Sequence, residues 1–445
     1  MAVSGPGTGV ENARASQHTP CKPDAHARGA LHITPDSRGS TLRKSLLVVI
    51  ALGLIAIATL TPLGGDHARR LSLCVGCGDF ALADALVNIA LFVPLGCAFA
   101  FRGPRTHRAL AWIALTSITV ETLQYVIVRG RTASVADVMA NTMGGALGMA
   151  MPGAWQWVLA STKHAAAATV AYGLMIAGLA AAALALQVMH PPPSVHWARP
   201  RVVRPGFVPF SGSVRSVRVA GTPVSERESH PVAPSDSVQL EVVLVAGQPP
   251  EGLAEVGQFW PGEREGKRAW SWVDQYDRDV RVHVRTGADA LRLRGNTSWV
   301  FGAMPGVAGD TVSVRVELRR FEYGIEVRHG ASITRKDAVV SLGDEWRLLV
   351  PFERQRERWS GTLTALWVAA LLFPLGLLAR LHSTKSLVAA ACVAAIYLAV
   401  LPIMAGCAAL PLAGWCGAVV GYVLGATLSW AFAARAAAHT RLMKM

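Results

Sequence analysis

Eight apolar stretches constrain this chain more than any other feature of its sequence. A helix needs about 20 predominantly apolar residues to cross the hydrocarbon core of a bilayer, and each stretch approaches or exceeds that length. The chain is 52% hydrophobic and 16% charged, which is too apolar for one soluble domain of 445 residues. We therefore expect a polytopic membrane protein with spans at about 45–63, 82–101, 109–128, 134–153, 165–189, 362–379, 386–405 and 408–434.

A long polar segment, residues 190–358, separates the fifth stretch from the sixth. It opens with a Pro-rich connector at 191–207, which favours an extended spacer. Short runs of β-branched residues follow, broken by Gly, Asn and Asp turn signals, and this pattern is typical of an antiparallel β-sandwich. The expected strands are 238–245, 280–284, 290–293, 311–318 and 323–327.

The loop cations predict the orientation of the helices. Arginine and lysine gather in alternate loops, for example at Arg102, Arg105, Arg108 and Lys163. The positive-inside rule then places both termini in the cytoplasm and residues 190–358 outside it. The expected domains are a disordered N-terminus (1–44), a five-helix domain (45–189), the extracytoplasmic β-sandwich (190–358), a three-helix segment (359–434) and a cytoplasmic tail (435–445).

The net charge of +14 does not indicate nucleic-acid binding, because the cations are dispersed among short loops. Cys74 and Cys77 form a C-V-G-C pair in a short loop. The spacing fits a local disulfide, a redox pair or half a metal site, and we favour the disulfide because no second pair or His cluster lies nearby. We expect no metal and no cofactor.

Three acidic residues lie inside the apolar stretches, at Asp84, Glu121 and Asp137. A carboxyl at the centre of a bilayer costs roughly 2.5–3.5 kcal/mol on insertion scales, so such residues are functional hypotheses by default. Each has an amide three or four residues further on, which shares its helix face. The expected ligand-binding residues, near the outer ends of their helices, are Asp84, Asn88, Glu121, Gln124, Arg129, Arg131, Asp137 and Asn141. The alternative is that these groups only tie helices together through hydrogen bonds.

The order of these residues resembles the VanZ-like family of small bacterial membrane proteins. The similarity covers roughly residues 45–155 and rests on Asp84, Asn88, Phe92, Pro94, Gly96, Ser117, Glu121, Gln124, Arg131, Asp137, Asn141, Gly145 and Gly148. The resemblance implies the bacterial inner membrane and the cell envelope, but it supplies no reaction.

The last three apolar stretches look like a degenerate copy of the same unit. Phe373, Pro374 and Gly376 echo Phe92, Pro94 and Gly96, and a glycine ladder follows one helix later in both regions. In the second region the ladder is Gly417, Gly421 and Gly425. The copy lacks the acidic and amide residues of the first, and chance similarity among apolar helices is the alternative reading.

The order and spacing of the predicted strands in the polar segment resemble those of a concanavalin A-like or laminin G-like jelly roll. Such folds bind glycans or act as protein-interaction modules. The run that carries the resemblance extends from Trp270 through Tyr276 and Val284 to the segments 312–318 and 323–327. Several aromatic side chains serve either as a sugar-stacking platform or as core: Trp260, Trp270, Trp272, Tyr276 and Trp299.

We expect a non-enzymatic envelope protein that binds an amphiphilic ligand, a lipid-linked glycan or an anionic lipid, at the outward-opening polar site. Membrane lipids are the expected partners, with an envelope glycan or protein at the sandwich. The rival hypotheses are an enzyme that uses Glu121 or Asp137 as acid or base, and a transporter. The enzyme is disfavoured because no partnered nucleophile, metal quartet or phosphate loop is visible.

Overall fold

The computed structural model describes residues 37–61, 70–103, 106–128, 132–200, 203, 206–233, 237–262, 268–351, 353–379 and 384–442. The chain divides into two units, 1–43 and 44–445, and the contacts discussed below lie within the second.

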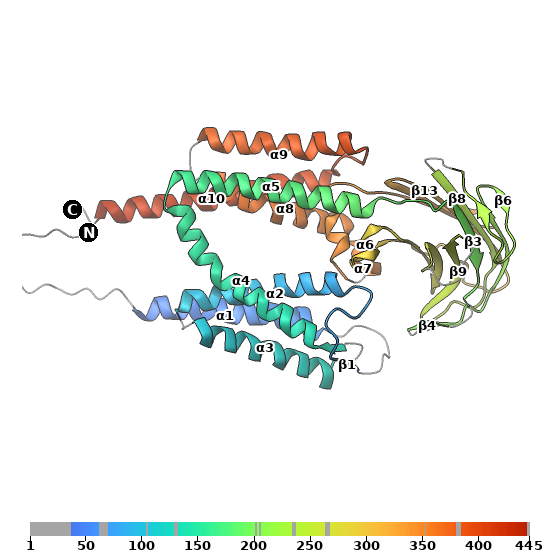
Figure 1. Ribbon diagram of the computed structural model, residues 1–445, viewed down its shortest axis with the longest axis horizontal. Coiled ribbons are helices and arrows are strands. Elements are labelled where there is room, and N and C mark those ends of the chain that lie inside the picture. The colour runs from blue at the N-terminus through green and yellow to red at the C-terminus, as the bar shows by residue number, and fades with distance from the viewer. Residues whose placement is uncertain are drawn as a thin grey trace, which may run out of the picture. The chain divides into compact units, whose positions relative to one another are not determined.

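Long helices occupy all eight stretches in which spans were expected (Figure 1). They are α1 (Ser37–Leu60), α2 (Ala81–Arg102), α3 (Thr106–Val126), α4 (Val135–Leu159), α5 (Thr162–Gln187), α8 (Ser360–Ala379), α9 (Thr384–Ala405) and α10 (Leu412–Leu442). The first and last extend beyond the expected spans. Among the described residues, five of these helices are long and apolar enough to cross a membrane: α2, α3, α5, α8 and α10. No more than 33% of any of these five apolar segments is buried by protein, so most of their surface requires an apolar surrounding.

Helices α2 and α4 lie side by side with their backbones nearly touching (Figure 1). A Cβ atom added at Gly144 would lie 2.1 Å from the Ile89 carbonyl oxygen, and one at Gly148 would lie 2.1 Å from that of Val93. Small residues permit this close approach, which favours helix association in a membrane.

Helices α8 and α10 pack in the same way. A Cβ atom added at Gly421 would lie 2.2 Å from the Ala369 carbonyl oxygen, and one at Gly425 would lie 2.1 Å from that of Phe373. Ala369 follows Ile89 by the same number of residues as Phe373 follows Val93. Likewise, Gly421 follows Gly144 by the same number of residues as Gly425 follows Gly148. The two helix pairs therefore use one packing register.

The polar segment folds into two sheets that share one hydrophobic core. The seven-stranded sheet contains β12 (Asn296–Val300), β11 (Asp279–Val284), β10 (Ser271–Tyr276), β9 (Leu253–Pro261), β3 (Ser194–Ala198) and β7 (His230–Pro231) in that order, with β4 (Phe207–Val208) paired to β9 in parallel. The six-stranded sheet runs β15 (Ser332–Val339), β14 (Glu322–His329), β13 (Thr311–Arg319), β8 (Ser237–Val245), β5 (Ser213–Val219) and β6 (Thr222–Pro223). Apart from the β4–β9 pair, neighbouring strands in both sheets are antiparallel.

Strands were expected at five places in this segment, and four of them are strands. The exception is 290–293, where helix α6 (Gly287–Ala290) ends and a turn follows. The prediction was wrong because Thr286 and Asp289 form a capping box, in which each side chain bonds the backbone N–H of the other residue. That local pair starts a helical turn despite the neighbouring apolar residues.

The sandwich packs directly on the ends of several helices. Ala183 of α5 and Ala83 of α2 share an apolar cluster with Leu293 and Leu348 of the polar segment. The Asn296 amide nitrogen also donates to the Gln187 carbonyl oxygen at 3.1 Å. The 3-10 turn η1 (Glu345–Leu348) and helix α7 (Glu353–Arg358) then lead the chain back into α8. Buried contacts therefore attach the sandwich to the helices both where the chain leaves α5 and where it approaches α8.

Candidate functional site

The structure brings the expected polar residues of α2, α3 and α4 together in pairs. The Asn88 amide nitrogen donates to a carboxylate oxygen of Asp137 at 2.7 Å, which links α2 to α4. The Asn141 amide nitrogen donates to the Ser117 hydroxyl at 2.9 Å, which links α4 to α3. Asn141 is 2% exposed, so this bond lies in the interior.

Glu121 and Gln124 make further hydrogen bonds near the C-terminal end of α3. A Glu121 carboxylate oxygen accepts from the Ser134 backbone N–H at 2.8 Å. The Gln124 amide nitrogen donates to the Thr59 carbonyl oxygen at 3.0 Å, which joins α3 to α1. Arg129 and Arg131, the predicted headgroup contacts, lie outside the described residues.

Asp84 has a different partner, and it lies in the sandwich. One of its oxygens accepts from the Arg294 guanidinium at 2.6 Å. Arg294 also donates to the Leu349 carbonyl oxygen at 3.1 Å, and its guanidinium lies 4.6 Å from the centre of the Phe80 ring. Asp84, one of the three carboxyls predicted for the site, therefore contacts the sandwich.

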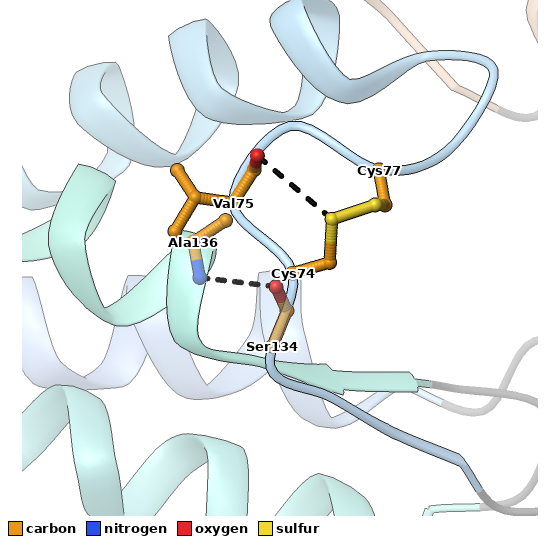
Figure 2. Close-up of a disulfide and its surroundings, with 5 residues drawn as sticks. All are labelled: Cys74, Val75, Cys77, Ser134 and Ala136. Atoms are coloured by element: carbon orange, nitrogen blue, oxygen red, sulfur yellow. Dashed lines mark hydrogen bonds between the residues drawn. A yellow bond between two sulfur atoms is a disulfide. The ribbon is translucent and has the colours of Figure 1, made fainter.

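The loop before α2 carries a disulfide between Cys74 and Cys77. Figure 2 shows this loop beside Ser134, whose hydroxyl accepts from the Ala136 backbone N–H and caps α4. Just before the loop, β1 (Arg70–Ser72) pairs in parallel with β2 (Thr132–Ser134). The disulfide loop is therefore held over the same helix ends that carry Glu121 and Asp137.

The face of the seven-stranded sheet that points away from the core is polar and aromatic. Val273, Val280 and Val282 face the core, so the alternate residues of β10 and β11 point outward. Trp272 lies directly opposite His283, and their rings stack with centroids 3.9 Å apart. Asp274 lies opposite Arg281 and accepts from its guanidinium at 2.6 Å.

This face forms one wall of a cavity of about 440 Å³. That volume falls in the range of about 300–1,000 Å³ found for small-molecule sites. Its lining residues are Asp79, Phe80, Phe207, Trp260, Arg268, Ala269, Trp272, Arg281, His283, Arg285, Asp289 and Glu353. Asp79 and Phe80 immediately precede α2, so the cavity joins the sandwich to the start of a membrane-length helix.

Several charged side chains of the cavity are held in pairs. Arg281 contacts Glu353 at 3.3 Å as well as Asp274, and His283 contacts Asp289 at 3.3 Å. Burial raises the pKa of Asp289, but the contact with His283, the hydrogen bond from the Thr286 backbone N–H and the charge of Arg285 together hold the pKa below its usual value. Burial likewise opposes ionisation of Glu353, and the charges of Arg281 and Arg356 still lower its pKa. Both carboxylates are therefore ionised acceptors near neutral pH.

The five aromatic residues noted in the sequence lie in three different environments. Trp270 belongs to the core, whereas Trp260 and Trp272 line the cavity. Tyr276 packs edge-on against Trp299, with centroids 6.3 Å apart. Sequence reasoning missed Arg281 and His283, although the alternation of polar and valine residues in D-V-R-V-H-V indicates an outward polar face.

Comparison with known proteins assigns part of the chain. The fold and the five membrane-length helices define a membrane protein. A family model described as VanZ/LLP1 matches residues 37–156, from α1 to near the end of α4, and the resemblance of this part of the chain to the VanZ-like family is thus confirmed. The chain carries a VanZ-like domain, which indicates a membrane protein of the cell envelope. No curated protein and no solved structure matches the chain.

Proposed function

We propose that this protein binds an amphiphilic ligand of the bacterial envelope, with its polar headgroup in the cavity between the sandwich and α2. One observation carries the proposal: Asp79 and Phe80 line the cavity and lie directly before the first turn of α2. A headgroup in the cavity thus lies where a membrane helix begins, and its apolar tail can extend beside α2 into the bilayer.

The proposed membrane arrangement has eight spans, both termini in the cytoplasm of a bacterial inner membrane, and residues 190–358 outside. Loop cations support this orientation. The disulfide at Cys74 and Cys77 supports it too, because disulfides persist in oxidising compartments. A Cβ atom added at Gly76 would lie 3.9 Å from the Arg292 guanidinium, so this loop and the sandwich share one side. The sandwich is proposed to be a jelly roll of the concanavalin A-like or laminin G-like kind.

The polar residues of α2, α3 and α4 have a supporting part in this proposal. Asn88, Asp137, Glu121 and Gln124 each make a hydrogen bond between segments, and these bonds tie α1, α2, α3 and α4 to one another. Asp84 positions the sandwich through Arg294. The predicted headgroup role of Arg129 and Arg131 remains part of the proposal.

Native mass spectrometry of the full chain, extracted from its membranes in mild detergent, tests the proposal. The wild type should retain an amphiphile, and the double variant Phe207→Ala with Trp260→Ala should retain at least fivefold less. Trp430→Ala removes an exposed aromatic residue of α10 and is the matched control. Equal retention by the wild type and the double variant would argue against a ligand in this cavity.

A further inference from the structure

We infer that the headgroup is a saccharide rather than an anionic lipid headgroup. The inference rests on the proposed function and names the chemical class that the cavity recognises. It follows from three properties of the lining residues: their aromatic surface, their balance of charge, and the pairing of their polar groups.

Aromatic rings supply the first property. Phe80, Phe207 and Trp260 are half-buried and line the cavity, so part of each ring is accessible from it. A pyranose ring has an apolar face of C–H groups, which packs well on an aromatic surface. A phosphate or a carboxylate has no such face and gains nothing from these rings.

Charge balance supplies the second property. The cavity is lined by three arginines, Arg268, Arg281 and Arg285, and by three carboxylates, Asp79, Asp289 and Glu353. His283 adds a positive charge when it is protonated, and Asp274 adds a negative charge beside Arg281. A site for anionic lipid depends on an excess of Lys and Arg, because their charges attract the headgroup. This cavity has no such excess.

The pairing of the charged groups supplies the third property. Asp289 already contacts His283 and accepts from the Thr286 backbone N–H, and Glu353 contacts Arg281. An ionised carboxylate can accept about four hydrogen bonds, so both can accept more from a ligand. Arg281 is planar and fixed by carboxylates on two sides. Fixed acceptors and donors beside aromatic rings match the hydroxyl groups of a sugar, each of which both donates and accepts.

The position of the cavity restricts the source of the saccharide. Phe80 is the residue before α2, and its ring also lies against the Arg294 guanidinium that bonds Asp84. A sugar in the cavity thus lies beside the contact that fastens the sandwich to the membrane helix. A saccharide attached to a membrane-embedded tail reaches this position without leaving the bilayer.

Ligands with one tail and different headgroups test the inference on the full chain in phosphatidylcholine nanodiscs. The probes are hexyl β-glucoside, hexyl β-maltoside, hexyl N-acetyl-β-glucosaminide and hexyl phosphate. Saturation-transfer NMR measures the binding of each. At least one glycoside should bind tenfold more tightly than hexyl phosphate, with transfer to its sugar-ring protons. Trp260→Ala should weaken glycoside binding about fivefold, and Trp430→Ala should not.

A second variant guards against an effect of misfolding. Asp79 is exposed, so Asp79→Ala should leave the fold intact and weaken glycoside binding about threefold. If hexyl phosphate binds as tightly as every glycoside, or if neither variant weakens glycoside binding, the saccharide assignment is overturned. The proposed function survives that result if native mass spectrometry still finds a phospholipid lost from the double variant. The proposed function is contradicted only if the wild type and the double variant retain the same amount of amphiphile.

Discussion

The α2–α4 pair and the α8–α10 pair share a packing register but differ in chemistry. Both bring glycine against a carbonyl oxygen at matched positions, as in Gly148 with Val93 and Gly425 with Phe373. At the positions of Asn88 and Asn141, however, the second pair has Val368 and Ala418, both buried in an apolar cluster. Small residues therefore permit the close packing of both helix pairs, and hydrogen bonds of Asn88 and Asn141 add to it only in the first.

The sandwich contacts both helix pairs at equivalent places. Asp84 of α2 bonds Arg294, and its counterpart in α8, Thr364, accepts from the Trp346 indole N–H at 3.0 Å. One contact is an ion pair with a half-exposed carboxylate, and the other is a buried neutral hydrogen bond. We propose that the two pairs are copies of one unit, and that the first copy kept the polar groups next to the cavity.

The largest expected effect concerns the shared register. Gly148→Leu and Gly425→Leu place a side chain where a carbonyl oxygen lies 2.1 Å from the added Cβ. Overpacking of this kind costs about 3 kcal/mol or more, so each variant should lose most of its thermal stability in detergent. Gly153→Leu and Gly173→Leu are helical controls with no atom within 4 Å. If Gly425→Leu keeps its thermal stability while Gly148→Leu loses it, the two helix pairs do not share one packing register.

The next effect concerns the two attachment points. Asp84→Ala leaves Arg294 without its carboxylate and should destabilise the protein by about 1–2 kcal/mol, because the carboxylate is half-exposed. Thr364→Val removes one buried acceptor and should cost about 1 kcal/mol. Chemical unfolding followed by tryptophan fluorescence measures both. High salt should reduce the first effect and leave the second unchanged.

A smaller effect separates the polar first pair from its apolar counterpart. Asn88→Val and Asp137→Ala remove the two ends of a 2.7 Å hydrogen bond between α2 and α4. Double-mutant cycles for such bonds in membranes average about 0.6 kcal/mol and reach about 1.7. We expect a coupling energy in this range from the two single variants and the double variant. A value near zero would remove the stabilising role given to this bond.

The smallest effect is a gain in stability beside α8. Burial raises the pKa of Glu345, although the Gly343 backbone N–H and the Trp367 indole N–H bond the same carboxylate oxygen. The folded state then binds a proton that the unfolded state releases, so stability falls as pH rises from the ordinary pKa through the raised one.

Glu345→Gln keeps an oxygen for both donors and removes this dependence. It should therefore be slightly more stable than the wild type at pH 7, and the two should converge in acid. Thermal denaturation between pH 4 and pH 8 gives the comparison. A variant less stable than the wild type at pH 7 would show that the carboxylate charge is needed there.

The sequence predicts helices well because their signal is long and local. All eight apolar stretches contain helices, and the register shared by the two pairs follows glycines that are visible in the sequence, such as Gly144 and Gly421. Strand 290–293 was predicted from apolar residues alone, and the capping box of Thr286 and Asp289 overrode them.

The candidate site was only partly predictable, because it depends on contacts between distant segments. Asn88 with Asp137 follows from two helices that share polar faces. The pairing of Asp84 with Arg294 joins residues far apart in the chain, and no local pattern indicates it. The cavity likewise needs Phe80 and Trp260 from different domains, so only the folded chain reveals it.

An experimental structure of the full chain, extracted with its native lipids into polymer-bounded nanodiscs, tests the ligand site most directly. We predict headgroup density against Trp260 and Phe207, with a tail that passes Phe80 and follows α2 into the bilayer. Density for the ligand among α2, α3 and α4, with the cavity closed by protein side chains, would contradict the proposal.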